Sequence, residues 1–512
     1  MKFNLQKLVL RNHPLFGGSF EVEFTDKNDF INNENIFDAP YATLIIGSNG
    51  TGKSLLLKEI SDIFLYLKKA KQGGDSFTKY NGVYFEITYS IFGDNFNVKN
   101  FSIEDNKVKR LPITTTKNGK DTLTSELELP ENIIVSSLLL NDKFTINKDY
   151  PDYYKYLGIR NIKTPSLAGT KNNIKKTLDL IYYNLGKNQT EIIYKIKSLL
   201  GFLEYDEAFR VNYKLRYKDY FFNQPLTIDR FDFLFQNFNV PNKGFSTRKD
   251  TEFIPFGVRY YKSNVEKNIK LKSEIVEFIN YIREVLSNKL SFDILKSQIP
   301  LNNYALLSDL NSLDLISFPQ INLERLEKKL DINEISSGEF HVLMSFIGIY
   351  ASINQNSLIL IDEPEISLHP NWQMKYISYL KEIFKDYQSC HFLITSHSHF
   401  FASDLDGRHS KIIGLKRDFE NKIDLVELPK DINTYGWSAE DILYNVFDVL
   451  STRNKFVAED VAKILNELSN GKKDKNNKIK KNTFEKLKYL NENLKDNDPL
   501  KIVVKSLIKK IK

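Results

Sequence analysis

The residues of this 512-residue chain that are best suited to chemistry form the glycine-rich segment Gly47–Ser54. Its spacing, Gly-x4-Gly-Lys-Ser, is that of a loop that holds phosphate groups. Glycines let backbone N–H groups turn towards an anion in positive-φ geometry, which a side chain would oppose. Lys53 would bring a positive charge to the outer phosphates, and the Ser54 hydroxyl is a hard oxygen ligand for Mg²⁺. The segment therefore predicts a nucleotide site.

Two adjacent carboxylates, Asp362 and Glu363, follow the apolar run Leu358–Ile361. Such a run predicts a buried strand, and the sites of open parallel sheets lie at the ends of the strands. A second apolar run, Cys390–Thr395, is followed closely by His397. The alternative is that the carboxylates only begin a turn and that the histidine caps a helix. We expect the two carboxylates to lie at the carboxyl end of a buried strand, where the sites of open parallel sheets are found.

A third polar stretch, Glu334–Glu339, precedes an apolar helix predicted over residues 340–353. Ser337 and Gly338 would place a hydroxyl and a bare backbone at the start of that helix. Helix N-termini attract phosphate, because their N–H groups have no partner within the helix. This stretch therefore marks the expected N-terminus of that helix.

The elements that must position these residues can also be predicted. Loose or strict alternation predicts strands over residues 3–10, 20–24 and 83–89, and a continuous apolar run predicts a doubly covered strand over 43–46. Two short antiparallel neighbours are expected near 101–103 and 108–111, and a buried strand at 132–136. After the glycine-rich segment, apolar residues recur at helical spacing. They are Leu56, Ile60, Ile63 and Leu67. We therefore expect a parallel core with an antiparallel flap.

The middle of the chain has a different pattern. Helices are predicted over residues 174–185, 191–203 and 269–290, with one strand over 209–217. In that strand apolar residues alternate with polar ones, so four cations share one face. They are Arg210, Lys214, Arg216 and Lys218. The stripe is either a surface for nucleic acid or an acidic partner, or a solvated face whose cations discourage edge pairing.

The bulk composition favours a cytoplasmic protein. Apolar residues make up 41% of the chain, and no run approaches the ~20 apolar residues needed to cross a bilayer, so no membrane partner is expected. The single cysteine excludes a disulfide within one chain. A net charge of +7 permits nucleic acid, DNA or RNA, as a partner without arguing strongly for it.

Together the motifs resemble those of the ATP-binding-cassette (ABC) ATPases, in the branch of SMC-like, RecF-like and OLD-like proteins. The matches are Gly47–Ser54 with the Walker A loop, Ile335–Glu339 with the signature, Leu358–Glu363 with Walker B and His397 with the switch histidine. The resemblance implies an α/β ABC-ATPase head, which is a P-loop NTPase with a mixed sheet and an antiparallel flap. It gives four parts: the head in residues 1–145 and 326–430, a mainly helical insert in 146–325, and a basic helical extension in 431–512.

The resemblance also assigns roles, with ATP and Mg²⁺ as cofactors. Lys53, Glu363 and His397 would be catalytic, with Glu363 as general base and His397 at the γ-phosphate. Asp362 and Ser54 would hold the Mg²⁺. One departure is that no glutamine stands in the expected Q-loop, where only Asn141 is a substitute. The residues expected to contact ATP are Gly47, Ser48, Asn49, Gly50, Thr51, Gly52, Lys53, Ser54, Ser336, Ser337, Gly338 and Glu339.

In this family the signature of one subunit closes over the ATP held by another, so the resemblance implies a homodimer, with a higher oligomer left open. The segment Glu365–Pro370 is typical of OLD-family and related bacterial-defence ATPases. Asp404 and Asp406 form an Asp-x-Asp pair, but no apolar strand ending in Glu-Gly precedes it, so a Toprim nuclease domain is not expected. The tail segments 435–443 and 451–454 are similar to PtuA-type ATPases of Septu and retron-linked antiphage systems, which are paired with a separate HNH nuclease.

The resulting expectation is an ATPase whose ATP-dependent dimerisation controls a partner nuclease, with no nuclease site of its own. One alternative is a RecF-like or SMC-like DNA-repair ATPase that binds DNA. The absence of a long heptad repeat weakens its SMC-like form. A third alternative is the ATPase subunit of a membrane transporter, and the Glu365–Pro370 segment argues against it.

Overall fold

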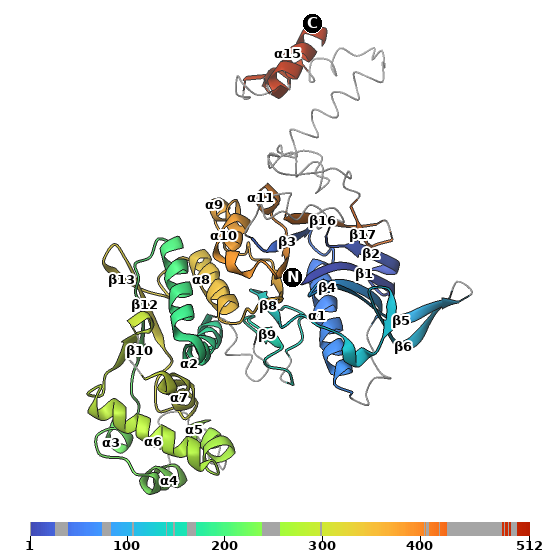
Figure 1. Cartoon of the computed structure of the whole chain (residues 1–512). Coiled ribbons are helices and arrows are strands. Elements are labelled where there is room, and N and C mark those ends of the chain that lie inside the picture. Colours follow the sequence, from blue (N-terminus) through green and yellow to red (C-terminus); the bar gives the residue numbers. More distant parts are fainter. Residues whose placement is uncertain are drawn as a thin grey trace, which may run out of the picture. The chain divides into compact units, whose positions relative to one another are not determined.

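The computed structural model has two compact units, Met1–Ile442 and Leu443–Lys512. The fold of the first unit contains all four motifs (Figure 1). The residues that the structure describes are 2–25, 39–73, 83–104, 107–139, 141–146, 149–160, 170–237, 256–296, 300–403, 405, 409–418, 420–426, 484–485, 487–489, 491–492 and 499–511.

A seven-stranded sheet forms the centre of the predicted head, in the order β17-β16-β3-β15-β14-β8-β9. All neighbouring strands in it are parallel except β16 and β17. Every residue of β3, β8, β14 and β15 is buried, as their continuous apolar runs predict. The strands are β3 (Tyr41–Gly47), β8 (Ile133–Ser137), β9 (Tyr154–Tyr156), β14 (Leu358–Asp362), β15 (His391–Ser396), β16 (Ser410–Arg417) and β17 (Ile423–Leu425).

A six-stranded antiparallel sheet, ordered β2-β1-β4-β5-β6-β7, is the predicted flap. The predicted antiparallel neighbours near residues 101–111 are present, with Ile103 opposite Val108. Helix α1 (Lys53–Lys71) packs with both sheets in one apolar core, where Phe3, Phe64 and Tyr89 form a cluster of ring contacts. The strands are β1 (Asn4–His13), β2 (Gly17–Glu23), β4 (Tyr84–Ile91), β5 (Asp94–Glu104), β6 (Lys107–Lys117) and β7 (Lys120–Thr122).

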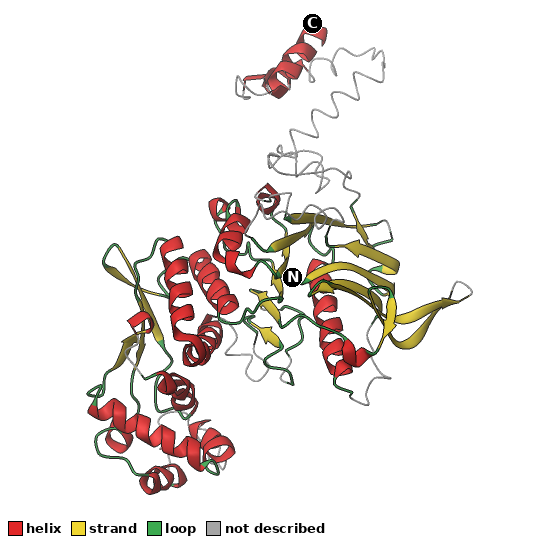
Figure 2. Ribbon diagram, in the orientation of Figure 1, coloured by secondary structure: helices red, strands yellow, loops and turns green. Residues whose placement is uncertain are grey.

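The middle of the chain is mainly helical, and Figure 2 shows its helices around a small sheet. The two helices predicted at 174–185 and 191–203 are wrong, because they form one helix, α2 (Thr170–Phe202). Gly186 lies between the two predicted segments, and a glycine inside a helix costs about 1 kcal/mol of helix stability. The packing of α2 on α8 (Ser337–Tyr350) and α7 (Leu301–Ser312) offsets this cost. The others are α3 (Lys218–Phe221), α4 (Ile228–Gln236), α5 (Phe256–Tyr260) and α6 (Ile269–Glu284).

The strand with the cationic stripe is shorter than predicted, because β10 ends at Tyr213. It is an inner strand of the four-stranded antiparallel sheet β11-β10-β12-β13, so the explanation by edge protection is wrong. Arg210 pairs with Glu324 at 3.0 Å, and Arg216 pairs with Asp314. Two of the four cations are therefore neutralised within the chain. The strands are β10 (Phe209–Tyr213), β11 (Leu290–Asp293), β12 (Gln320–Arg325) and β13 (Lys328–Asp331).

Two short helices follow β14, namely α9 (Pro370–Gln373) and α10 (Tyr376–Ile383). His369 caps α9, because its Nδ1 accepts the backbone N–H of Asn371 at 3.3 Å. The short helix α11 is His399–Ser403.

The tail is described only in part. Helix α15 (Pro499–Ile511) is present in the second unit. The segments 435–443 and 451–454 and the residues Asp404 and Asp406 lie outside the described residues. Among the helices of the described part, none has the length and hydropathy of a membrane span.

His391 joins the two large sheets and makes folding sensitive to pH. Its Nδ1 accepts the Leu5 N–H at 3.1 Å, and its Nε2 lies 2.8 Å from the Thr43 hydroxyl. Complete burial lowers the pKa of His391 to about 3, so the folded chain keeps the imidazole neutral. The unfolded chain protonates it below its ordinary value of about 6.5. The free energy of unfolding should therefore fall by about 1.4 kcal/mol per pH unit from pH 6.5 downwards.

Urea unfolding of the native chain and of His391→Asn at pH 6.5, 5.75 and 5.0 tests this. The variant is expected to be less stable at pH 6.5 but to lose less of its stability with acidification. Equal pH dependence of the two proteins would contradict the assignment.

Candidate functional site: a phosphate loop facing two carboxylates and a histidine

The glycine-rich segment links β3 to α1, as predicted, and is packed tightly against β16 and β17. Gly52 caps α1 in the left-handed region, with φ of 82°. A Cβ at Gly52 would lie 2.2 Å from the Ile423 side chain, and one at Gly47 would lie 2.3 Å from the Leu415 carbonyl oxygen. Larger residues would displace the loop at both positions. The tight packing keeps the loop and the N-terminus of α1 in a fixed geometry that suits a phosphate chain.

Lys53 is the charge at the centre of the site and is only 3% exposed. Its Nζ donates to the carbonyl oxygens of Gly47 at 2.9 Å and Ser48 at 3.1 Å. It also lies 3.0 Å from both ring nitrogens of His397. Burial lowers the pKa of Lys53 to about 8, and nearby carboxylates, led by Glu363, oppose that shift. The predicted loop lysine and switch histidine thus meet directly.

Asp362 and Ser54 form the predicted metal pair. Asp362 is fully buried, and its Oδ1 accepts the Thr395 hydroxyl at 2.7 Å. The Ser54 hydroxyl also bonds to this carboxylate. Burial raises the pKa of Asp362 to about 6, so a cation here would remove an unfavourable buried charge.

A carboxylate and a hydroxyl are hard oxygen donors that fit Mg²⁺. In the described part of the chain, no group of three or more acidic, histidine or cysteine side chains is placed to hold a metal. Mg²⁺ would therefore have to complete its shell with phosphate oxygens and water, as it commonly does in nucleotide sites.

Glu363 is held at the mouth of this site by a strained backbone. Its φ is 49°, and its N–H bonds to both the carbonyl oxygen and the hydroxyl of Thr395 at 3.2 Å. Oε1 of Glu363 lies 2.9 Å from Nε2 of His397. This contact lowers the pKa of Glu363, which keeps the carboxylate ionised and able to accept a proton. Strained φ values in ordered residues cluster where function fixes them.

Two further residues belong to the site and were missed at the sequence level. Glu365 is mostly buried, and its Oε1 accepts the His397 N–H, so it holds the histidine backbone in place. Its Oε2 has no hydrogen-bond partner among the residues that the structure describes. Arg417 donates from Nε to the Gly50 carbonyl oxygen at 2.8 Å. The Glu-Pro-Glu spacing was the only sequence signal for Glu365, and Arg417 had none.

The expected Q-loop region contributes a different acid. Asn141 is exposed, whereas its neighbour Asp142 is buried and bonded by the Tyr156 hydroxyl. Repulsion from the Asp142 carboxylate contributes, after burial, to the raised pKa of Asp362. No role for Asn141 follows from this geometry.

The signature segment starts α8, as predicted, but among the described residues its partners differ from those of the phosphate loop. Ser336 is the N-cap and forms a capping box with Glu339. Glu339 also bonds to Arg325 of β12 at 2.7 Å, whereas the charged neighbours of Lys53 are Glu363, Glu365 and Asp362. Ser336 and Ser337 are exposed. Glu339 and Lys53 thus have different charged partners within one chain, while Gly338 packs against the Ser367 carbonyl group in the loop that follows Glu363.

Comparison with known proteins identifies the family. Residues 4–402 match the family model described as AAA ATPase domain. The chain therefore belongs to the AAA ATPase domain family. This match confirms the prediction that the chain is an ATPase-type nucleotide-binding protein.

Three curated proteins are similar to this chain. The chain is 21% identical to the retron Vc95 probable ATPase of Vibrio cholerae serotype O1 biovar El Tor, over 86% of this chain and 79% of that protein. It is 29% identical to Septu protein PtuA of Bacillus thuringiensis over 23% of this chain and 29% of PtuA. It is 26% identical to the retron Ec83 probable ATPase of Escherichia coli over 28% of this chain and 27% of that protein. The last two matches span less than a third of those relatives. The predicted resemblance to PtuA and retron ATPases is confirmed.

Among solved structures, the SMC head domain of Thermotoga maritima aligns with a TM-score of 0.35 and 11% identity, over 83% of this chain and 99% of that one. The Smc head of Pyrococcus furiosus bound to the C-terminal domain of ScpA aligns with a TM-score of 0.32 and 15% identity, over 83% of this chain and 96% of that one.

Arg325 links the signature segment to the small sheet, and its loss should weaken the signature without touching the phosphate loop. Its guanidinium lies 4.1 Å from the Tyr205 ring centroid while it bonds to Glu339. If ATP joins two copies through the signature, Arg325→Ala should weaken that association about fivefold, the effect of one partly exposed charged contact. ATP binding by the single chain should not change. Sedimentation and nucleotide titration measure the two quantities.

Arg216→Ala is a matched control, because it breaks an arginine–carboxylate pair with Asp314 that does not involve the signature. Arg325→Lys should recover only part of the loss, since lysine keeps the charge but not the planar fork. Equal weakening by both alanine variants would show that general loosening, not the signature, is responsible.

Proposed function

We propose that this chain is an ATPase that binds MgATP between two copies of itself and thereby controls a nuclease carried by a separate polypeptide. The observation that supports the proposal best is the division of the site. Lys53, Asp362, Glu363 and His397 converge at the carboxyl ends of the parallel strands, whereas Ser337 is exposed on another helix. A nucleotide could contact both groups if a second copy supplied one of them.

In the proposed reaction, Lys53 and the N-terminus of α1 neutralise the phosphate chain. Asp362 and Ser54 would hold Mg²⁺, which neutralises charge on the β- and γ-phosphates when it is bound. Glu363 accepts a proton from the attacking water and His397 orients both Glu363 and the γ-phosphate. Catalysis of this kind consists mainly of positioning and charge neutralisation, so the buried and mutually bonded arrangement suits it.

We propose a partner because the chain is similar to Septu PtuA and to two retron ATPases. This partner would be an HNH nuclease, as the resemblance to PtuA-type ATPases implies. The test is to purify this chain alone and incubate it with plasmid DNA, Mg²⁺ and ATP. We expect ATP hydrolysis and intact DNA. Metal-dependent cleavage that persists in Lys53→Ala would contradict the proposal.

The same purified chain separates the proposal from a DNA-repair ATPase. Salt-sensitive binding to duplex DNA in the absence of any nuclease would favour the repair alternative. Genes beside this one provide a second test, because an adjacent HNH reading frame is expected.

A further inference from the structure

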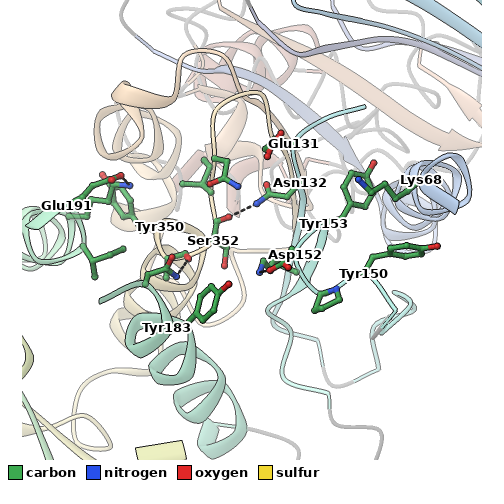
Figure 3. Close-up of a pocket in the computed structure, with 18 of the residues that line it drawn as sticks. Lys68, Glu131, Asn132, Tyr150, Asp152, Tyr153, Tyr183, Glu191, Tyr350 and Ser352 are labelled. Atoms are coloured by element: carbon green, nitrogen blue, oxygen red, sulfur yellow. Dashed lines mark hydrogen bonds and ion pairs between the residues drawn. The ribbon is translucent and has the colours of Figure 1, made fainter. Parts of the chain in front are cut away.

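A polar pocket of about 590 Å³ lies at the opposite edge of the parallel sheet from the phosphate loop. Its walls come from the middle of α2, from the residues at the starts of β8, β9 and β14, and from the ends of α1 and α8 (Figure 3). The phosphate loop and Asp362 follow the carboxyl ends of β3 and β14, so the two sites are separated by the length of these strands. The proposed function uses none of the residues in this pocket.

The charges and dipoles around this pocket favour a cation. The lining holds four carboxylates and three lysines. Each lysine already has a partner: Lys195 bonds to Glu191, Lys155 lies 3.7 Å from Asp152, and Lys68 lies over the ring of Tyr153. Both α1 and α8 present their C-terminal ends here, and helix C-termini carry partial negative charge. An anion such as phosphate is therefore disfavoured.

Three buried polar atoms of the lining have no hydrogen-bond partner among the described residues. They are Oδ1 of Asn132, the hydroxyl of Tyr153 and Oγ of Ser352. These side chains are 0%, 4% and 6% exposed. The Tyr153 ring belongs to the apolar core, whereas Asn132 and Ser352 lie side by side, because the Asn132 amide donates to the Ser352 carbonyl oxygen at 2.6 Å. A small shift of the Asn132 or Ser352 side chain would offer an acceptor to a ligand rich in donors. Buried polar groups are rarely left unpaired, which makes such a cluster unusual.

Tyrosine rings complete the pocket. Tyr183 of α2 and Tyr150 of the segment before β9 line opposite sides of it, and Tyr183 is 46% exposed (Figure 3). A planar cation with several donors can stack on such rings while it bonds to carboxylates. We propose that this pocket receives a guanidinium group, supplied by an arginine side chain of a partner polypeptide.

Helix α8 connects the pocket to the predicted nucleotide contacts, so a ligand in the pocket could affect them. Tyr350 and Ser352 lie at the end of α8, whose first turn contains Ser337. A ligand that orders the end of α8 would bias the start of the same rigid helix. This coupling rests on the proposed function, whereas binding to the pocket does not.

The experiment measures calorimetric binding of N-acetyl-arginine-methylamide to the full chain at low salt. Its uncharged isostere N-acetyl-citrulline-methylamide is the matched ligand, and agmatine tests whether a free guanidinium suffices. We expect the arginine compound to bind at millimolar concentration or below, at least tenfold more tightly than the citrulline compound. Binding of agmatine alone would assign the site to a small molecule and overturn the polypeptide partner.

Two variants locate the binding. Glu131→Gln removes an exposed carboxylate of the lining, and Ser352→Ala removes an unpartnered hydroxyl. Each should weaken the arginine compound about fivefold. Glu23→Gln, an exposed acid on β2 outside the pocket, should have no effect. Equal binding to all three variants, or no binding at millimolar concentration, would overturn the proposal.

Lys53→Ala separates this inference from the proposed function. The variant should lose ATP binding and keep the affinity for the arginine compound. If the native chain does not bind the arginine compound but still associates with ATP, the pocket proposal is rejected and the proposed function stands. If it binds the arginine compound but does not associate with ATP, the ATP-dependent dimer is rejected and the pocket proposal stands.

Discussion

Glu363→Gln is expected to reduce ATP turnover by about 10²–10⁴-fold, the usual contribution of a general base, while ATP binding is retained. Glutamine has nearly the shape of glutamate and can still accept the bond from Nε2 of His397, which lies 2.9 Å from the carboxylate. It cannot take a proton from water. If hydrolysis separates the two copies, this variant should accumulate as an ATP-bound dimer that light scattering detects as a doubled mass.

Lys53→Ala is the reference for that measurement, because it should show no change of mass with ATP. Native protein should show a transient or smaller change, since it consumes the nucleotide. Glu363→Gln that binds ATP and remains at the mass of one chain would reject the ATP-dependent dimer. Turnover within tenfold of the native rate would reject Glu363 as the base.

Ser337→Arg is expected to abolish turnover without disturbing the fold of the single chain. Ser337 is exposed at the first position of α8, so a longer side chain meets no described neighbour there that it must displace. It would, however, obstruct the approach of a triphosphate held by a second copy. Lys53→Ala should be equally inactive for the opposite reason, since it spoils the phosphate loop and leaves the signature intact.

Mixing these two inactive variants makes the test decisive. A mixed pair has one complete nucleotide site, which combines the intact phosphate loop of the Ser337→Arg chain with the intact signature of the Lys53→Ala chain. Neither variant should form a stable ATP-bound pair with itself, so mixed pairs are favoured, and an equal mixture should restore roughly a quarter to a half of the native rate. No recovery, at concentrations where native chains associate, would show that Lys53 and Ser337 do not act on the same nucleotide across two chains.

Much of the site could be predicted because its residues are tied to their elements by local rules. The apolar run of β14 places Asp362 and Glu363 at a strand end, and the glycines before Lys53 allow the positive-φ turn that leads into α1, with Gly52 at a φ of 82°. Ser336 was expected near a helix start and is the N-cap of α8. In each case the deciding interaction spans only a few residues, so a single sequence suffices to identify it.

Predictions failed where packing overrides local preference. The break expected near Gly186 is absent, because α2 packs along α8 and α7 as one helix. The cationic stripe was predicted to be a surface for nucleic acid or an acidic partner, or a solvated face, and Lys214, Arg216 and Lys218 are exposed. The pairing of Arg210 with Glu324 and of Arg216 with Asp314 was not predicted. Those acids are about a hundred residues away in the sequence, and only the sheet brings them close.

By itself, the sequence determined that this chain is a P-loop ATPase of α/β class, because strand, glycine turn, lysine and helix are fixed by backbone geometry within one short segment. Only the tertiary structure decided which charges share the site. Glu365 reaches the backbone of His397 and Arg417 reaches Gly50 because parallel strands bring distant segments to one edge. The pocket at the opposite edge was likewise invisible in the sequence, since its unpaired polar atoms come from three separate segments.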